Sequence, residues 1–258
     1  MYTIGIDIGS VTAKGALLSG DTLLGADYCF TGYNAKTAAQ KILDRLLEVH
    51  GIDQTEISGI VATGYGRNSV PFANRKLTEI MCHAWGARHL HPNVQVVIDI
   101  GGQDSKAIIL NEGGNVANFI MNDKCAAGTG RFLEVMARAL EVDLDEFGAL
   151  SLKAEQPEKI SSLCAVFAES EVVSLIAGGK KRENIIAGIH EAIGSRVSAM
   201  ASRLGIHPSA PIMMTGGVAK NIGLVNAMEK ALGAPIIVSP HAQITGAIGA
   251  ARLAQSSG

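Results

Sequence analysis

Two cysteines lie in small-residue contexts that suit a metal ligand. Cys125 lies in NDKCAAGTGRF and Cys164 in SSLCAVFAES, each ahead of a run that we predict to be helical. The positive end of a helix dipole favours the thiolate, which is the form that binds metal. Neither cysteine belongs to a Cys-x-x-Cys pair, so spacing alone leaves ligation and packing as equal alternatives. Cys29 and Cys82 lie in mixed apolar stretches, where core packing is the better interpretation.

Two cysteines of one chain cannot complete a site that needs four thiolates. A two-fold dimer can bring Cys125 and Cys164 of each chain to the symmetry axis. Four thiolates would then be available, which is enough for one four-iron cluster. The spacing permits this arrangement without requiring it.

A glycine loop near the N-terminus has the residue types of a phosphate site. Its backbone can close around phosphate oxygens, its hydroxyl groups can donate hydrogen bonds, and its lysine can neutralise phosphate charge. Asp7 precedes the loop and suits Mg2+, directly or through water. The predicted nucleotide-binding residues of this loop are Gly9, Ser10, Val11, Thr12, Ala13 and Lys14.

A second loop repeats the Asp-Ile-Gly signature. Asp99 again ends an apolar run, and Gly101 and Gly102 follow it as candidate nucleotide-binding residues. Gln103 and Asp104 come next, and their side chains can orient an attacking water. We therefore predict that Gln103, Asp104 and Asp7 are the catalytic residues.

A third loop, MMTGGVAKN, leaves an apolar run and precedes a helical one. Its residues Gly216, Gly217 and Val218 would let an adenosine lie against the backbone. Any one of these glycine turns alone is better explained as an ordinary turn. The three together favour a nucleotide site, although the Walker A pattern is absent.

The elements that must position these loops follow from an internal repeat. Tyr2 to Leu18 and Val94 to Leu110 both read as strand, glycine turn and strand, so we predict two β-hairpins and a duplicated domain. Helical spacing predicts helices, and short apolar runs between turn residues predict further strands. Alternation of the two predicts an α/β fold. The predicted helices are Ala38 to His50, Thr129 to Leu140, Ala187 to Leu204 and a last small-residue helix; the further strands are Ser58 to Gly64, Ala210 to Gly217 and Ala234 to Pro240.

Composition excludes several classes of function. The 258 residues carry 22 basic and 24 acidic side chains with no basic block, so no nucleic-acid partner is expected. No run reaches the length of about 18 apolar residues that a membrane span needs. The N-terminus lacks the basic region of a signal peptide, and Asp7 interrupts its apolar run. We expect a soluble, cytoplasmic protein with no membrane partner.

The three loops resemble those of the actin, sugar-kinase and heat-shock-70 ATPase superfamily. The resemblance implies two duplicated ribonuclease-H-like α/β domains with ATP in a cleft between them. We predict an N-terminal domain over residues 1–91 and a C-terminal domain over 92–258, which carries both candidate cluster cysteines. The last helix is expected to return to the N-terminal half.

A closer resemblance covers essentially the whole chain. The motifs VATGYGRNS, VIDIGGQD, NDKCAAGTGRFLEVMA, VFAESEV, IIAGIH and MTGGVAKN look like those of the activators of 2-hydroxyacyl-CoA dehydratases, which are BadF/BadG/BcrA/BcrD-type ATPases. The resemblance implies a homodimer with one [4Fe-4S] cluster shared between subunits. It places the cluster ligands at Cys125 and Cys164 and the phosphate loops at Asp7 to Lys14 and Gly101 to Asp104. Gln243 matches a motif near the family's C-terminal helix, where it contacts the nucleotide or caps the helix.

The mechanism that this resemblance implies is an ATPase coupled to one-electron transfer. A ferredoxin or flavodoxin would donate the electron, and Mg2+ would accompany ATP or ADP. ATP would act as a switch, and the electron would pass at low potential to a partner iron–sulfur dehydratase. The helix from Thr129 would point its N-terminus at the cluster and stabilise its negative charge.

Three alternatives remain open from the sequence. The first is a small-molecule kinase of the same superfamily, with Asp104 as its base, although such an enzyme has no use for Cys125. The second is an ATP-dependent reductase that serves a benzoyl-CoA reductase or a double-cubane-cluster protein, which would share every motif. The third is an ATP-dependent assembly factor without iron.

Overall fold

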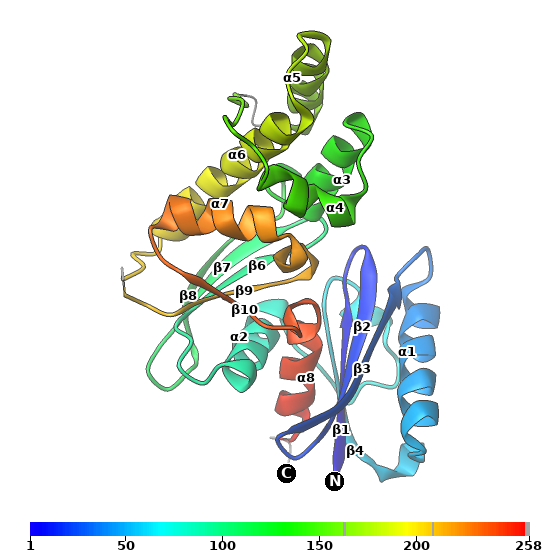
Figure 1. Cartoon of the computed structure of the whole chain (residues 1–258). Coiled ribbons are helices and arrows are strands. Elements are labelled where there is room, and N and C mark those ends of the chain that lie inside the picture. The colour runs from blue at the N-terminus through cyan, green and yellow to red at the C-terminus, as the bar shows by residue number, and fades with distance from the viewer. Residues whose placement is uncertain (162–163, 208, 256–258) are drawn as a thin grey trace. The chain divides into compact units, whose positions relative to one another are not determined.

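A computed structural model describes residues 1–161, 164–207 and 209–255 of the chain (Figure 1). Its strands are β1 (Tyr2–Ile8), β2 (Thr12–Ser19), β3 (Thr22–Phe30), β4 (Ile57–Thr63), β5 (Arg75–Lys76), β6 (Val96–Ile100), β7 (Ser105–Leu110), β8 (Val116–Asn122), β9 (Ile212–Thr215) and β10 (Ile236–Val238). Its helices are α1 (Ala35–His50), α2 (Glu79–Leu90), α3 (Gly130–Ala139), α4 (Leu144–Ser151), α5 (Ala165–Ala177), α6 (Arg182–Ser202), α7 (Ile222–Leu232) and α8 (Thr245–Gln255). Strands and helices alternate, which confirms the predicted α/β class.

The residues group into two compact units by their mutual contacts. The first unit contains residues 1–97, residues 108–118 and the chain from Ser239 onward. The second contains Ile98–Ala107 and Phe119–Val238. The division of the chain at residue 91 stays a prediction.

The first unit is built on a five-stranded sheet in the order β3-β2-β1-β4-β5 (Figure 1). β1 and β2 are antiparallel, as the first repeat predicts, and their register sets Asp7 opposite Lys14. β4 runs parallel to β1 on its other side. β1 is buried from Thr3 onward, as a central strand with helices on both faces requires.

Helix α1 covers one face of this sheet. The Asn34 side chain caps its first turn by accepting a hydrogen bond from the Thr37 backbone N–H at 3.1 Å. Gly51 ends the helix in the left-handed conformation, with φ of 62°. Between the caps, Ile42 and Leu43 lie on the buried stripe that meets the isoleucines of β1.

Helix α8 covers the opposite face, beside α2. Ala247 and Ile248 form a buried cluster with Ala16 of β2. The small residues of α8 allow this close packing: a Cβ at Gly249 would lie 1.7 Å from the carbonyl oxygen of Cys82 in α2. The C-terminal helix is therefore an integral layer of the first unit.

The second unit contains most of a five-stranded sheet in the order β10-β9-β6-β7-β8. Its central strand β6 is buried along its whole length, and β7 follows it as the partner strand of the second predicted hairpin. Helices α6 and α7 pack on each other, and α4 packs on both. Ile186 and Ile189 of α6 are fully buried.

Element boundaries differ in detail from the predictions. α1 begins at Ala35 and α6 at Arg182, each several residues earlier than predicted. The edge strands β3 and β8 were not predicted. Burial along β3 alternates, and β8 is exposed or half-buried throughout, so neither carries the continuous apolar run that predicted the central strands.

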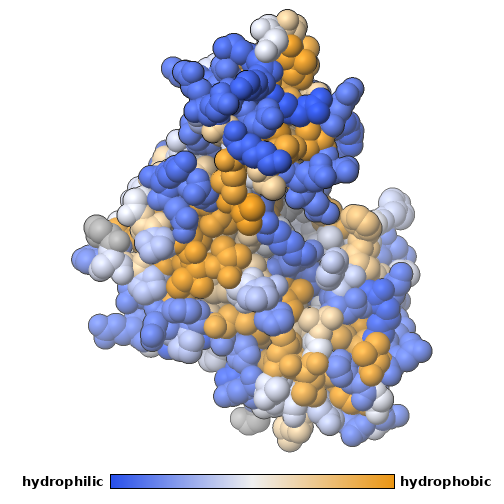
Figure 2. Space-filling model, in the orientation of Figure 1, coloured by the Kyte–Doolittle hydropathy of each residue, from blue (hydrophilic) through white to orange (hydrophobic). Residues whose placement is uncertain are grey.

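Helix α5 carries an exposed apolar surface. Val166 and Phe167 are 68% and 67% exposed, and Val173 and Ile176 are also largely exposed. Figure 2 shows this apolar surface over α5, at the top of the view. Among the described residues, no helix has the length and apolar character needed to cross a membrane.

Candidate functional site

The first candidate loop sits on a buried ion pair. Lys14 Nζ lies 3.1 Å from Asp7 Oδ2, and both side chains are largely buried. The antiparallel register of β1 and β2 produces this pairing, because it places the two residues opposite each other. The loop above the pair remains accessible: Ser10 is exposed, and Val11 and Thr12 are half-buried.

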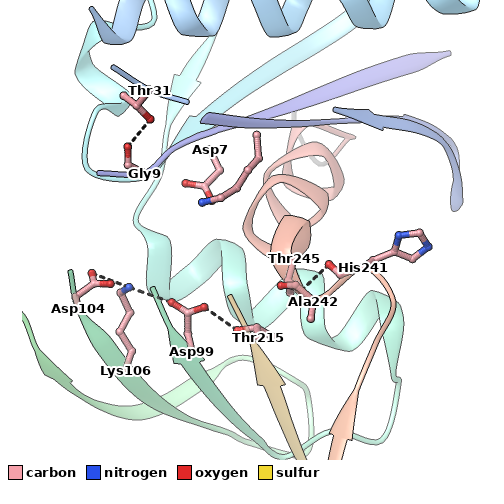
Figure 3. Close-up of polar contacts among 11 residues, drawn as sticks. Asp7, Gly9, Thr31, Asp99, Asp104, Lys106, Thr215, His241, Ala242 and Thr245 are labelled. Carbon is pink, nitrogen blue, oxygen red and sulfur yellow. Dashed lines mark hydrogen bonds and ion pairs between the residues drawn. The ribbon is translucent and has the colours of Figure 1, made fainter. Parts of the chain in front are cut away.

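Backbone hydrogen bonds hold this loop in shape. The Gly9 N–H donates to the Thr12 carbonyl at 3.0 Å, which closes the turn. The Thr31 hydroxyl donates to the Gly9 carbonyl at 2.8 Å (Figure 3). The Thr31 N–H donates to the Val11 carbonyl at 2.9 Å. The turn is thus fixed before any ligand binds, as a phosphate site requires.

The second loop repeats this design with a deeper lysine. Lys106 Nζ lies 3.1 Å from Asp99 Oδ2 and 2.8 Å from Asp104 Oδ2, so it bridges the two carboxylates (Figure 3). The Thr215 hydroxyl donates to Asp99 Oδ1 at 2.9 Å. Lys106 and Asp99 are each only 2% exposed, whereas the Asp104 side chain is 25% exposed. Asp104 is therefore the carboxylate of this group that solvent can reach.

A glycine with positive φ stands against the aspartate in each unit. Gly64 has φ of 90°, and a Cβ there would lie 2.5 Å from Asp7 Oδ1. Gly216 has φ of 88°, and a Cβ there would lie 2.9 Å from Asp99 Oδ1. Both positions require glycine, because φ is positive there and because a Cβ would be too close to the aspartate.

The third candidate loop follows β9. Gly217 is exposed, and no atom lies within 4 Å of a Cβ built there, so its backbone is open to a flat ligand. Val218 is buried and lies in a short 3-10 turn, Gly217–Lys220, which separates the loop from the helix. Gln243 belongs to the first unit, where it is half-buried in the 3-10 turn before α8.

The second loop is joined directly to helix α3. The first N–H groups of α3 lack partners within the helix. Gly130 N–H donates to the Gly101 carbonyl at 2.9 Å, and Arg131 N–H donates to the Gly102 carbonyl at 2.8 Å. These two N–H groups therefore bind the loop carbonyls, and the orientation of this helix N-terminus toward a cluster stays a prediction.

The two candidate ligand cysteines occupy different local settings in the second unit. Cys125 is half-buried, and its carbonyl accepts a hydrogen bond from the Asn122 side chain at 2.8 Å. Cys164 is exposed and is the N-cap residue of α5, as the predicted helix start requires. Both are free thiols. Within the described ranges, no group of three or more His, Cys, Asp or Glu side chains could hold a metal ion.

The other two cysteines are packing residues, as predicted. Cys29 packs against the core cluster of the first unit, and Cys82 is fully buried beside Ala250. Burial raises the pKa of the Cys82 thiol to about 12. Cys82 therefore stays protonated at neutral pH, which is unfavourable for a metal ligand.

Sequence reasoning missed Lys106 as a site residue. A usable signal was present, because Lys106 follows Asp99 by seven positions and Lys14 follows Asp7 by seven. Thr215 was also missed, since its contact with Asp99 joins residues 116 positions apart. That contact can be seen only after β9 is placed beside β6.

Comparisons with known proteins extend this description. The sequence model of the BadF/BadG/BcrA/BcrD ATPase family matches residues 4–254. The chain is 48% identical over 252 residues to the activator of lactoyl-CoA dehydratase of Anaerotignum propionicum, covering 97% of this chain and 96% of that protein. It is 33% identical over 259 residues to one of the subunits of the benzoyl-CoA reductase of Thauera aromatica, covering 96% and 91%.

Solved structures show the same fold. The activator of the 2-hydroxyisocaproyl-CoA dehydratase from Clostridium difficile with bound ADPNP matches with a TM-score of 0.93 and 43% identity, covering 99% of this chain and 95% of that one. A glucokinase of the ROK family from Streptomyces griseus matches with a TM-score of 0.59 and 14% identity, covering 100% of both chains. The second likeness shows the fold alone, which is the predicted actin-like ATPase fold.

Proposed function

Because the chain belongs to the BadF/BadG/BcrA/BcrD ATPase family, we propose that it is an ATP-hydrolysing electron-transfer activator of a 2-hydroxyacyl-CoA dehydratase. The protein from A. propionicum that is 48% identical to it is named as such an activator. The benzoyl-CoA reductase component is less similar, so a reductase of that kind is the second candidate partner. A small-molecule kinase gains no support from the glucokinase, since that likeness concerns the fold only.

Both hairpin loops and the third loop contact the nucleotide in this proposal. Lys14 and the backbone around Gly9 bind phosphate oxygens, and the open backbone at Gly217 lies against the adenosine. The accessible carboxylate of Asp104, beside Gln103, orients the attacking water. The proposed nucleotide site also includes Asp7, Asp99, the rest of the first loop, Gly101, Gly102, Gly216, Val218 and Gln243.

Magnesium is part of the proposal on chemical grounds. Mg2+ is held through one or two carboxylates and the phosphates of the nucleotide, and it keeps several waters. Asp7 already contacts Lys14, and Asp99 contacts Lys106 and Thr215, so water-mediated binding suits both aspartates better than direct ligation. The two lysines would then hold the carboxylates at fixed positions.

The junction between the second loop and α3 is the observation that carries the coupled function. Hydrogen bonds from Gly130 and Arg131 to the loop carbonyls fix the start of α3 to the proposed phosphate site. Cys125 lies in the segment immediately before that helix. A rearrangement of Gly101 and Gly102 on ATP hydrolysis would therefore move the segment that carries Cys125.

The proposed cofactor is one [4Fe-4S] cluster shared by two copies of the chain. When bound, such a cluster supplies a one-electron carrier. Cys125 and Cys164 fit as its ligands because both are free thiols and neither is fully buried. The exposed apolar side chains of α5 beside Cys164 support a homodimer, since a second copy would cover them.

The remaining partners follow from the same role. A ferredoxin or flavodoxin would supply the electron, and the dehydratase would receive it. The proposal places the protein in the cytoplasm, where free thiols stay reduced.

The test is a chemical analysis of protein purified without oxygen. Iron, acid-labile sulfide, absorbance and molar mass should indicate about four irons per dimer for the wild type. Cys125→Ser and Cys164→Ser should each lose the iron. Cys29→Ser, a half-buried thiol of the first unit, is the matched control and should keep it.

Electron delivery is measured separately with a purified 2-hydroxyacyl-CoA dehydratase, ATP and a chemical reductant. Dehydration should depend on ATP and should vanish in both ligand variants. A colourless wild-type protein that hydrolyses ATP as a monomer would refute the activator function and favour an iron-free ATP switch. Activity with a benzoyl-CoA reductase but with no dehydratase would select the second candidate.

A further inference from the structure

Helix α6 carries a buried histidine that has no role in the proposed nucleotide site. His190 ends the motif IIAGIH and is only 1% exposed. Its ring lies 5.5 Å from the ring of Phe147 in α4, measured between centroids, with an angle of 78° between the planes. On the α7 side, a Cβ at Gly223 would lie 2.8 Å from His190 Nδ1. A polar ring enclosed in this way needs a hydrogen-bond partner.

That partner is Asn221, the residue between the third loop and α7. The side-chain nitrogen Nδ2 of Asn221 lies 3.1 Å from His190 Nε2. The side-chain oxygen Oδ1 of Asn221 accepts a hydrogen bond from the Leu224 N–H at 2.9 Å and so caps α7. One amide group therefore connects α6 to the first turn of α7.

The Leu224 N–H determines how this amide is oriented. A backbone N–H can only donate, so the Asn221 atom that faces it must be the carbonyl oxygen. The atom that faces His190 is then the NH2 group, which also only donates. His190 Nε2 must therefore accept, and the single ring proton must lie on Nδ1.

A second proton on this ring would break the contact. It would bind to Nε2 and place an N–H of the imidazolium against the NH2 group of Asn221. Burial lowers the pKa of His190 to about 4, so the ring is neutral at neutral pH. Within the described residues, Nδ1 has no hydrogen-bond partner, which leaves Asn221 as the polar contact of the ring.

Asn221 also ends the third loop. Gly216, with φ of 88°, precedes the 3-10 turn Gly217–Lys220, and the Asn221 N–H closes the turn by donating to the Val218 carbonyl at 2.9 Å. The exposed backbone of Gly217, which we propose to contact the adenosine, lies between these two points. A displacement of Asn221 would therefore change the part of the loop that meets the nucleotide.

We infer that His190 is a positioning residue for the adenosine of ATP and acts on the third loop through Asn221. The ring orients the amide, the amide caps α7, and the start of α7 sets the end of the loop. This inference rests on the proposed nucleotide function and adds to it a residue that does not touch the nucleotide. Loss of His190 should weaken recognition of the adenosine and leave recognition of the phosphates, which the other two loops bind, unchanged.

The position of the ring proton is tested on the nucleotide-free full chain, isotope-labelled in nitrogen. Long-range proton–nitrogen correlation spectra near pH 7 distinguish the two neutral tautomers and the imidazolium. Signals that vanish in His190→Gln belong to this ring, and the wild type should show the proton on Nδ1. Asn221→Asp keeps an oxygen for the Leu224 N–H but replaces the amide donor by a second acceptor, so it should move the proton to Nε2.

The kinetics of ATP hydrolysis test the link to the nucleotide. His190→Leu removes the acceptor and should raise KM for ATP about tenfold, the equivalent of one hydrogen bond, with kcat unchanged within about twofold. Tripolyphosphate lacks the adenosine, so its inhibition constant against ATP should be the same for the variant and the wild type.

Two further variants control this experiment. His190→Gln places a carbonyl oxygen at the distance of Nε2 along the side chain, so it should restore KM for ATP. His207→Leu makes the same replacement at an exposed histidine of the second unit and should leave KM and kcat unchanged. Circular dichroism checks folding, and His190→Asn, whose shorter amide does not reach Asn221, replaces His190→Leu if that variant misfolds.

Three results would overturn the inference. The first is a proton on Nε2, or an imidazolium, in the wild type. The second is an unchanged KM for ATP in the folded His190→Leu variant. The third is an equal rise of KM for ATP and of the inhibition constant of tripolyphosphate, which would indicate a general structural role. A wild type that neither binds nor hydrolyses ATP would refute the proposed function and with it this role of His190, whereas the spectra test the contact with Asn221 independently.

Discussion

Replacement of Lys106 by methionine is the most informative single change in the second unit. Lys106 and Asp99 form a buried ion pair at 3.1 Å, with side chains that are 2% and 3% exposed. Methionine keeps a similar chain length but removes the charge. Asp99 would then keep the Thr215 hydroxyl as a hydrogen-bond donor and lose its cation.

The size of the effect follows from burial. Removal of one partner from a buried ion pair costs about 3–5 kcal/mol, because the other charge remains in a medium of low dielectric constant. Asp104 adds little to this cost, since its side chain is 25% exposed and can turn to water. We expect Lys106→Met to lower the free energy of unfolding by about 3–5 kcal/mol.

The repeat supplies a matched control in the same molecule. Lys14→Met breaks an ion pair of the same length, 3.1 Å, but the Lys14 side chain is 14% exposed. Water can partly replace the lost cation there, so the loss should be smaller. Urea unfolding followed by circular dichroism measures both variants, and ATP hydrolysis should fall in both because both loops bind the nucleotide in our proposal.

A double variant decides whether charge is the cause. Asp99→Asn/Lys106→Met removes both charges, so it should be about 2 kcal/mol more stable than the sum of the two single changes predicts. If the losses simply add, the buried charge is not the source of the effect. A loss for Lys106→Met no larger than that for Lys14→Met would refute the argument from burial.

Burial lowers the pKa of His190 from 6.5 to about 4. The free energy of unfolding should therefore be highest above about pH 6.5 and should be about 2 kcal/mol lower at pH 5. Urea titrations should show that His190→Gln abolishes this loss. Gly216→Ala places a Cβ 2.3 Å from the Ile100 carbonyl oxygen, so it should lower the free energy of unfolding by at least about 2 kcal/mol and should weaken ATP binding. Gly217→Ala places its Cβ in open space, so it should change neither the free energy of unfolding nor ATP binding. Because burial raises the pKa of Cys82 to about 12, maleimide at about pH 8 should leave it unmodified in the native iron-free protein and label it after denaturation, which mass spectrometry can follow.

The edge strands show what the sequence could not predict. β8 is a full strand, but its burial pattern does not follow the alternation or continuous apolar run that identifies strands in a sequence. Its position at the end of the sheet order explains this, because an edge strand needs less apolar surface than a central one. Strand β8 was therefore identified only from the structure.

The α/β class, both hairpins and the candidate loops can be predicted from the sequence alone. Local patterns suffice for these features: an apolar run followed by Asp-Ile-Gly specifies a strand and its turn, and the repeat reveals the second copy. The contacts between side chains from distant elements depend on the tertiary fold. Two such contacts are the Thr215–Asp99 hydrogen bond and the attachment of α3 to Gly101 and Gly102. Both depend on the order of the strands and the placement of the helices. That arrangement is set by the packing of buried surfaces from residues that are distant in sequence.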